Sequence, residues 1–245
     1  MKRLGAHLTC ILLLLSGCSR NQPGDTTAHP LHAKAVGWQM VEVSGDKQAG
    51  GVGAALQDPV VVQVNGADGS PVAGALVSFY GEGLKLHPSQ DVSDASGQVS
   101  IAVQLGGVPG SYRIIAETPK TGGGSASVEM REIALGYEQK VGRDINEKYC
   151  IRCHDQESTP ERVSNFDNLS PAPHGFSDGA FLNPISDADL IKLIAQGGPA
   201  LSKSPAMPAF GSTLSLSQIK AVMTYMRAIA DPPYQAARAE GKTKR

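Results

Sequence analysis

Residues 150–154 read CIRCH, which places Cys150, Cys153 and His154 within five positions. Three chemistries use such a group of side chains: a structural zinc ion, a thiol–disulfide pair, or a covalently attached haem. The rest of the chain decides between them, and the choice determines the fold of the C-terminal half.

Zinc and thiol–disulfide exchange are both disfavoured. A structural zinc site needs four protein ligands, whereas the pentapeptide offers at most three and the sequence has no second C-x-x-C. The neighbouring Cys153 and His154 also cannot easily both face one ion. A thioredoxin-like pair is expected to open a helix in a β-α-β unit, but here a helical stretch precedes the cysteines and no parallel-sheet pattern surrounds them.

The order C-x-x-C-H is the attachment pattern of c-type haem. Each thiol forms a thioether with one haem vinyl group, the two-residue gap matches the spacing of the vinyls, and the following histidine lies under the iron. The pattern therefore predicts one haem c, attached through Cys150 and Cys153, with His154 as an axial iron ligand.

The N-terminal segment has the features of an export signal. Lys2 and Arg3 precede an apolar run that ends at Leu15, and this run is shorter than the roughly 20 residues of a membrane span. LSGC, residues 15–18, resembles the lipobox of bacterial lipoproteins, which implies cleavage before Cys18 and lipidation of its side chain. Ser19 in the next position favours the outer over the inner membrane by the same resemblance. The alternative is an ordinary secretory signal.

Export also simplifies the cysteine count. The chain has four cysteines; Cys10 leaves with the signal and Cys18 carries lipid, so Cys150 and Cys153 are the pair that remains. Without a disulfide framework, this pair must be explained by its local chemistry. Export is consistent with a haem because bacteria attach c-type haem outside the cytoplasm.

Composition and apolar patterning divide the chain into five predicted parts: a signal peptide (1–17), a polar tether (18–35), a β-rich part (36–133), a helical part (134–235) and a flexible tail (236–245). Removal of Lys2 and Arg3 leaves 20 of the 22 Lys and Arg residues against 23 Asp and Glu residues. No basic stripe or basic–aromatic run occurs, so nucleic acid is not expected as a partner.

Residues 36–133 are predicted to form an all-β sandwich, because short runs rich in β-branched residues alternate with turn signals. Val99, Ile101 and Val103 alternate with polar or small residues, as in a strand with one buried face. The expected strands are PVVVQV (59–64), ALVSFY (75–80), QVSIAVQL (98–105), SYRIIAE (111–117) and ASVEMRE (126–132).

The pieces VQVNGADGSPVAGALVSF, SDASGQVSIAV and GSYRIIAE occur in an order that resembles the bacterial Ig-like domains of invasin and intimin. The resemblance implies an Ig-like fold. It implies little about function, because such sandwiches serve many roles.

Three helices are expected in the C-terminal part, at 137–149, 185–198 and 214–233. Ser186 is a predicted N-cap of the second helix, and Ser215 with Gln218 forms a predicted capping box of the third. An apolar stripe of period 3.6 marks the buried face of the last helix.

Between the second and third helices, residues 197–211 read GGPALSKSPAMPAFG. With CIRCH, the Met-Pro-x-Phe order of residues 207–210 resembles class I mono-haem cytochromes c, an all-α fold. The resemblance implies that Met207 is the second axial iron ligand and that Phe210 belongs to the apolar shell of the haem. His174 is the alternative sixth ligand.

In that family, a proline carbonyl after CxxCH accepts the ring N–H of the proximal histidine. Pro171 and Pro173 are the candidates for this role, which fixes the tautomer of the histidine. Tyr149 and Tyr225 are candidates for packing at the haem, with ordinary core packing as the alternative.

His–Met ligation saturates the iron and leaves no position for substrate, so the expected activity is electron transfer and not catalysis. A thioether ligand and an apolar shell both raise the potential, which predicts a positive, mid-to-high value. The expected partners are redox proteins and, through Cys18, the lipid bilayer. The Ig-like part would act as spacer or docking module, and the chain could be the electron-delivering subunit of an oxidoreductase. The alternative is a haem-containing redox or gas sensor, or an adhesion module, that binds its partner through the Ig-like part.

Overall fold

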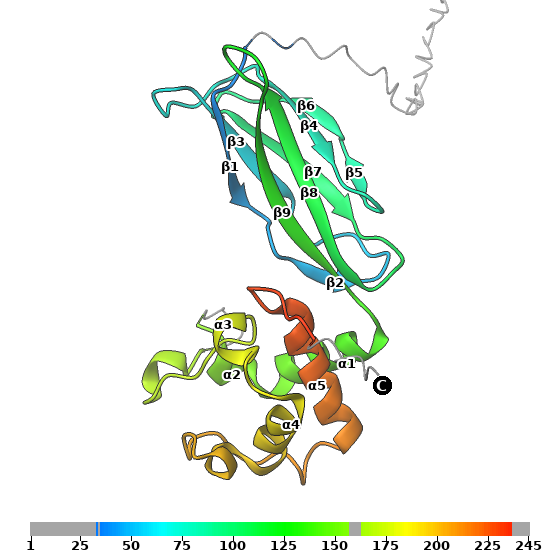
Figure 1. The fold of residues 1–245 in the computed structure, drawn as a ribbon, viewed down its shortest axis with the longest axis vertical. Coiled ribbons are helices and arrows are strands. Elements are labelled where there is room, and N and C mark those ends of the chain that lie inside the picture. Colours follow the sequence, from blue (N-terminus) through cyan, green and yellow to red (C-terminus); the bar gives the residue numbers. More distant parts are fainter. Residues whose placement is uncertain (1–32, 34, 157–162, 237–245) are drawn as a thin grey trace, which may run out of the picture. The chain divides into compact units, whose positions relative to one another are not determined.

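A β-sandwich followed by a helical part makes up the fold (Figure 1). The computed structural model describes residue 33, residues 35–156 and residues 163–236, which all belong to the unit Leu31–Arg245. The predicted signal peptide, Cys18, most of the tether and the tail from residue 237 lie outside the described residues. Within them, no helix has the length and apolar character that crossing a membrane requires.

Two sheets build the sandwich, and all strand pairs are antiparallel except β2 with β9. The first sheet has the order β1 (Gln39–Ser44), β3 (Val60–Asn65), β7 (Gln98–Gln104), β5 (Lys85–His87). The second has the order β2 (Ala49–Gly51), β9 (Ser125–Leu135), β8 (Gly110–Pro119), β4 (Leu76–Tyr80), β6 (Gln90–Val92).

Alternating burial explains why these strands face one another. In β7, Val99, Ile101 and Val103 are buried while the residues between them are more exposed, as the sequence predicts. Ile114 of β8 and Val77 of β4 belong to the second sheet and are fully buried in the same core. Burial of such branched side chains contributes about 1.5–3 kcal/mol each, so the alternation fixes which face of each strand points inward.

The predicted sandwich is confirmed, and the strands that the sequence analysis did not single out are β1, β2, β5 and β6. β2, β5 and β6 each have three residues, too few to show a period of two. β1 buries Met40 and leaves Val43 exposed, so its apolar residues do not mark one face.

The helical part contains α1 (Tyr137–Tyr149), α2 (Ile151–His154), α3 (Gly179–Leu182), α4 (Asp187–Gln196) and α5 (Leu216–Ile229), with 3-10 turns at Phe166–Asn168 and Gly198–Leu201. The predicted caps are confirmed. Ser186 accepts a hydrogen bond from the Asp189 N–H, and Ser215 and Gln218 form a capping box at α5. This confirms the all-α class of the second part.

Helices α1 and α5 pack unusually closely at Gly142. A Cβ at this position would lie 2.0 Å from the Ala221 carbonyl oxygen and 2.8 Å from Cβ of Tyr225. Only glycine allows the two helix backbones to approach so closely. The contact lies two turns before CIRCH, so it positions the helix that leads into that motif.

Strand β9 passes into α1 through Gly136 alone. β9 continues through Leu135, into residues that the sequence analysis assigned to the helical part. Near its end, Glu132 is fully buried. One carboxyl oxygen, Oε2, accepts the Gln48 N–H at 2.9 Å, while Oε1 has no hydrogen-bond partner in the described part of the chain. Burial raises the pKa of Glu132 to about 8, so the folded protein holds this carboxyl protonated at neutral pH.

Glu132→Gln is expected to remove a pH-dependent loss of stability. The unfolded state ionises near pH 4.5 and the folded state near 8, so between these values the unfolded state binds fewer protons and the free energy of unfolding falls as pH rises. At 1.36 kcal/mol per pH unit, the three units from pH 5 to pH 8 correspond to at most about 4 kcal/mol. Urea unfolding at these two pH values measures the difference.

The matched control is Glu129→Gln on the same strand. Glu129 is exposed and pairs with Arg113 at 3.5 Å, so its removal should leave the pH dependence of wild type unchanged. An equal pH dependence in wild type and Glu132→Gln would contradict a raised pKa at this site.

Candidate functional site

The CIRCH motif lies at the end of α1 and forms one further helical turn. Cys150 is the C-cap of α1, and its carbonyl accepts hydrogen bonds from the N–H groups of Cys153 and His154, both at 3.0 Å. Positions three and four apart lie on one side of a helix. The turn therefore presents both thiols and the imidazole to the same side, and both thiols are free and half-buried.

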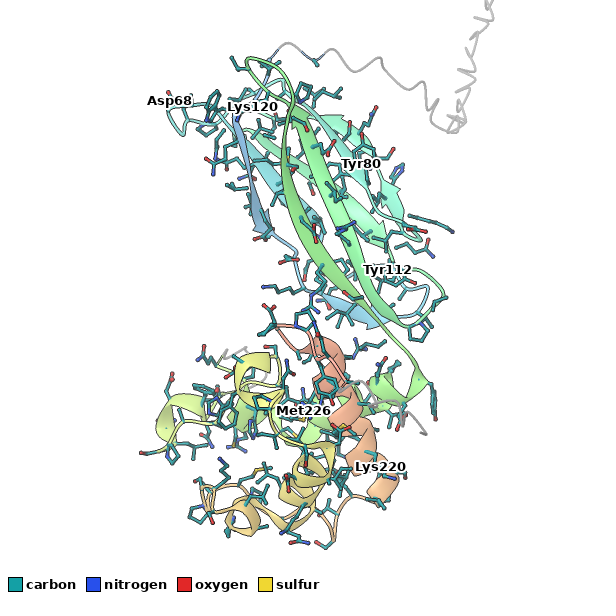
Figure 2. All side chains as sticks on the ribbon, viewed as in Figure 1. Asp68, Tyr80, Tyr112, Lys120, Lys220 and Met226 are labelled. Atoms are coloured by element: carbon teal, nitrogen blue, oxygen red, sulfur yellow. The ribbon has the colours of Figure 1, made fainter. Side chains whose placement is uncertain are left out.

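An apolar cavity of about 380 Å³ opens beside this turn. It brings together the residues that the sequence analysis selected from distant positions: Cys150, Cys153, His154, Pro171, Pro173, His174, Met207 and Phe210. Its volume is within the range of cofactor pockets, about 300–1,000 Å³. α5 contributes Met226 to the lining, and Figure 2 labels both this buried residue and the exposed Lys220 of the same helix.

The donor set of this cavity fits a haem. Two thiols suit thioether attachment, and an imidazole and a thioether suit the two axial positions of the iron. Among the described residues no group of three or more His, Cys, Asp or Glu is arranged to hold a metal ion by itself. If His154 and Met207 bind an iron ion, its four remaining ligands would come from a porphyrin.

His154 is held in one orientation by a backbone carbonyl. Its Nδ1 lies 2.6 Å from the His174 carbonyl oxygen, so Nδ1–H donates and Nε2 is left for the metal. Desolvation by burial lowers the pKa of His154, which keeps the ring neutral as metal binding requires. Phe176 packs against the imidazole, with ring centroids 5.2 Å apart.

The prediction of a proline carbonyl as the acceptor is corrected by this contact. The acceptor is His174, the residue after Pro173, while Pro171 and Pro173 line the cavity. The proline-rich segment after CxxCH, expected from the family, is thus the right segment. Within it, the backbone presents the carbonyl of His174, and not that of a proline, to the ring of His154.

The side chain of His174 has other partners. Its Nδ1 lies 2.8 Å from a carboxylate oxygen of Asp178, and its ring stacks on Phe181 with centroids 3.4 Å apart. The hydrogen bond from His174 lowers the pKa of Asp178. His174 therefore has a structural role beside the proximal ligand, which favours Met207 over His174 as the second axial ligand.

Met207 lies in a loop that is fastened to the end of α4. The Gly198 N–H donates to the Met207 carbonyl at 3.0 Å, and the Phe210 N–H donates to the Ile194 carbonyl at 3.0 Å. A Cβ at Gly198 would lie 1.9 Å from the Ser204 carbonyl oxygen, so the loop closes on itself only with glycine there. Such a preformed loop can keep a weakly binding thioether in place.

The surroundings of Cys150 oppose thiol–disulfide catalysis. Burial raises the pKa of the Cys150 thiol to about 11, whereas redox-active C-x-x-C pairs have a lowered thiol pKa. The thiol is therefore held neutral. This is further evidence against the redox-pair interpretation of CIRCH.

The tyrosines divide between the two roles considered for them. Tyr149 lines the cavity and meets Phe210 edge-to-face at 6.3 Å. Tyr225 does not line the cavity; it is buried against Ile133 and Leu135 at the end of the sandwich. The sequence analysis did not select Phe176, although its position two residues after His174 places it beside the proximal ligand.

The fold and this site define a cytochrome c domain that follows an Ig-like sandwich. Residues 138–226 match the family model "Cytochrome C oxidase, cbb3-type, subunit III", which confirms the resemblance inferred from CIRCH and Met-Pro-x-Phe. A cytochrome c domain implies a haem cofactor and electron transfer.

Among solved structures, the chain is similar to the D00-D0 domain of intimin, with 16% identity and a TM-score of 0.31 over 41% of this chain and 50% of that one. For invasin, a bacterial integrin-binding protein, the identity is 22% and the TM-score 0.30, over 39% of this chain and 19% of that one. For the Yersinia pseudotuberculosis adhesin InvE, the identity is 9% and the TM-score 0.31, over 40% of this chain and 32% of that one. The chain thus spans half or less of these structures, and the comparison with curated proteins gave no match.

Gly198→Ala is expected to displace the Met207 loop, because the added methyl group would collide with the Ser204 carbonyl. Overpacking of this kind costs about 1–3 kcal/mol. If Met207 binds the iron of a covalently attached haem, the sulfur–iron charge-transfer band of the oxidised variant should weaken or disappear while the haem stays on the protein.

Gly175→Ala is the matched control, because its Cβ would meet its nearest neighbour, the His154 carbonyl oxygen, at 3.7 Å, an ordinary contact. An unchanged charge-transfer band in Gly198→Ala would show that the loop does not hold Met207 on the iron.

Proposed function

We propose that this protein is a lipid-tethered mono-haem c-type cytochrome that carries single electrons between redox partners in the cell envelope. The observation that carries the proposal is the convergence of Cys150, Cys153, His154 and Met207 on one apolar cavity. A protein that only bound partners would have no need for two thiols, an imidazole and a thioether around an apolar space.

In this proposal Cys150 and Cys153 hold one haem as thioethers, and His154 and Met207 are its axial ligands. When bound, the haem supplies a one-electron Fe(III)/Fe(II) couple. The chain supplies the surroundings: the apolar wall excludes water, and the His174 carbonyl holds the proton on Nδ1 of His154.

Three of these features act on the potential, two of them in one direction and the third in the other. Thioether ligation and an apolar wall disfavour the extra positive charge of the ferric state and raise the potential. The hydrogen bond to the His174 carbonyl makes the imidazole more basic and favours the ferric state. We expect the first effect to dominate and the potential to be positive.

With both His154 and Met207 bound to the iron, no position would be left for a substrate, so the protein would transfer electrons without catalysing a reaction of its own. Its partners are redox proteins, and it works as a free carrier or as the electron-delivering subunit of an oxidoreductase. Lipid on Cys18 would tether it to a membrane, with the outer membrane favoured. Fully extended, a tether of residues 18–35 could span on the order of 55–60 Å.

Spectroscopy of protein made in a host that matures c-type cytochromes tests the haem and its ligands. The haem should remain on the protein under denaturing conditions, and Cys150→Ala or Cys153→Ala should leave a single thioether, which shifts the pyridine haemochrome band. Met207→Ala should lose the sulfur–iron band and lower the potential.

Met223→Leu is the control for Met207→Ala, because Met223 is buried on α5 and does not line the cavity. Wild type should not bind carbon monoxide when reduced, whereas Met207→Ala should. Rapid binding by wild type would replace the carrier proposal with the gas-sensing alternative, and loss of haem on denaturation would exclude covalent attachment.

Cys18→Ser tests the tether. Because several acyl chains on one residue anchor a protein stably, wild type should sediment with membranes and incorporate labelled palmitate, whereas the variant should incorporate none. Wild type without incorporated palmitate would contradict lipidation at Cys18.

A further inference from the structure

The end of the sandwich contacts the haem-binding part with side chains from two strand regions. Nη2 of Arg131 on β9 donates to the Ala230 carbonyl at 3.1 Å. Nζ of Lys47, before β2, lies 2.7 Å from a carboxylate oxygen of Asp231. From the other side, Nη1 of Arg143 on α1 donates to the Ala49 carbonyl of β2 at 3.1 Å.

Apolar residues fill the space between these polar contacts. Ile133 and Leu135, near the end of β9, lie outside the sandwich core and are buried with Tyr225 of α5. Phe176 and Ile229 pack against the same cluster. β9 and α1 are joined by Gly136 alone. A flexible connection between the two parts is therefore absent at this joint.

Ala230 and Asp231, the residues that the sandwich holds, in turn hold the segment beside the proximal ligand. The Asp231 N–H donates to the Ser177 carbonyl at 2.8 Å, and the Gly179 N–H donates to the Asp231 carbonyl at 3.0 Å. This pairs residue 231 with the stretch 177–179 as in a short parallel bridge.

The same stretch leads to His154. The carboxylate of Asp178 binds the imidazole of His174, whose carbonyl accepts the Nδ1–H of His154. Phe176 contacts both the His154 ring and the apolar cluster at the end of β9. Contacts are thus continuous from Arg131 to the proximal ligand by a polar and an apolar route.

We propose that the Ig-like sandwich is a positioning element of the haem site, in which Arg131 and the end of β9 fix segment 174–179 and thereby the hydrogen bond of His154. The inference rests on the proposed function, since it assumes that His154 binds the haem. It gives the sandwich a role beyond spacing: it sets the reduction potential.

Arg131 is a better side chain to test than Lys47, because the ion pair between Lys47 and Asp231 is half-exposed. Exposed ion pairs contribute little, and Lys47 and Asp231 are each about half-accessible. Arg131 instead gives a charged hydrogen bond to a carbonyl next to the buried cluster, and such bonds are stronger than neutral ones.

Arg113 provides a matched control. It lies directly opposite Arg131 in the β8–β9 register, so Arg113→Gln and Arg131→Gln each remove one positive charge at neighbouring points of the same sheet. Arg113 instead pairs with Glu129, an exposed residue of the same sandwich, and makes no contact with Ala230. The general electrostatic effect on the iron is therefore similar in both variants, and a difference between them reports the contact with Ala230.

The experiment is an equilibrium redox titration of the full-length holoprotein and both variants. Loosening of the His174 carbonyl makes His154 less basic, so the midpoint potential of Arg131→Gln should rise relative to that of Arg113→Gln. The hyperfine-shifted proton resonances of the axial ligands should move in Arg131→Gln and stay unchanged in Arg113→Gln. Equal potentials and resonances in the two variants would overturn the proposal.

A second measurement uses the single tryptophan of the chain, Trp38 in the sandwich. In wild type, Trp38 fluorescence and the Soret band should report one unfolding transition in urea, since the two parts share a buried cluster. Two separate transitions in wild type would overturn the proposal. If Arg131→Gln does not fold, Lys47→Gln and the exposed Lys85→Gln give the same comparison, with a smaller rise expected for Lys47→Gln.

The two proposals fail in different ways. Wild type without covalently bound haem would overturn the proposed function, and the positioning role with it. Variants that carry haem and have equal potentials would overturn the positioning role alone.

Discussion

The close crossing of α1 and α5 at Gly142 is the constraint on which the site depends. Because a Cβ there would lie 2.0 Å from the Ala221 carbonyl oxygen, the two helices meet backbone to backbone, and this contact fixes the direction in which α1 enters CIRCH. α5 also contributes Val222 and Met226 to the cavity wall. One helix contact therefore sets both the attachment turn and the wall opposite it.

The cavity is polarised between its two axial sides. On the side of Met207 the chain offers a loop closed by backbone hydrogen bonds, so the weak thioether is held by its surroundings. On the side of His154, the His174 carbonyl accepts the hydrogen bond of the imidazole, and Asp178 binds the side chain of His174. In the proposed haem site, preorganisation would hold the ligand on the first side and hydrogen bonding would strengthen the ligand on the second side. The potential would then balance the two effects.

Local signals in the sequence predicted local structure well. Ser186 and Ser215 cap the helices they were expected to cap, and CIRCH with Met-Pro-x-Phe selected residues that line one cavity. The acceptor for His154 could not be predicted, because it depends on how the backbone turns between Pro173 and His174. The burial of Glu132 was equally hidden, since a carboxylate in a strand pattern is usually exposed.

The joint between the two parts is short and buried. A sandwich that served only as a spacer would tolerate a flexible linker, which preserves reach at little cost in free energy. Here Gly136 is the whole connection, and Tyr225, whose hydroxyl pKa is raised to about 12 by burial, seals the joint against Ile133 and Leu135. These buried contacts are what the sandwich needs if it is to hold the proximal segment, and they would be superfluous for distance alone.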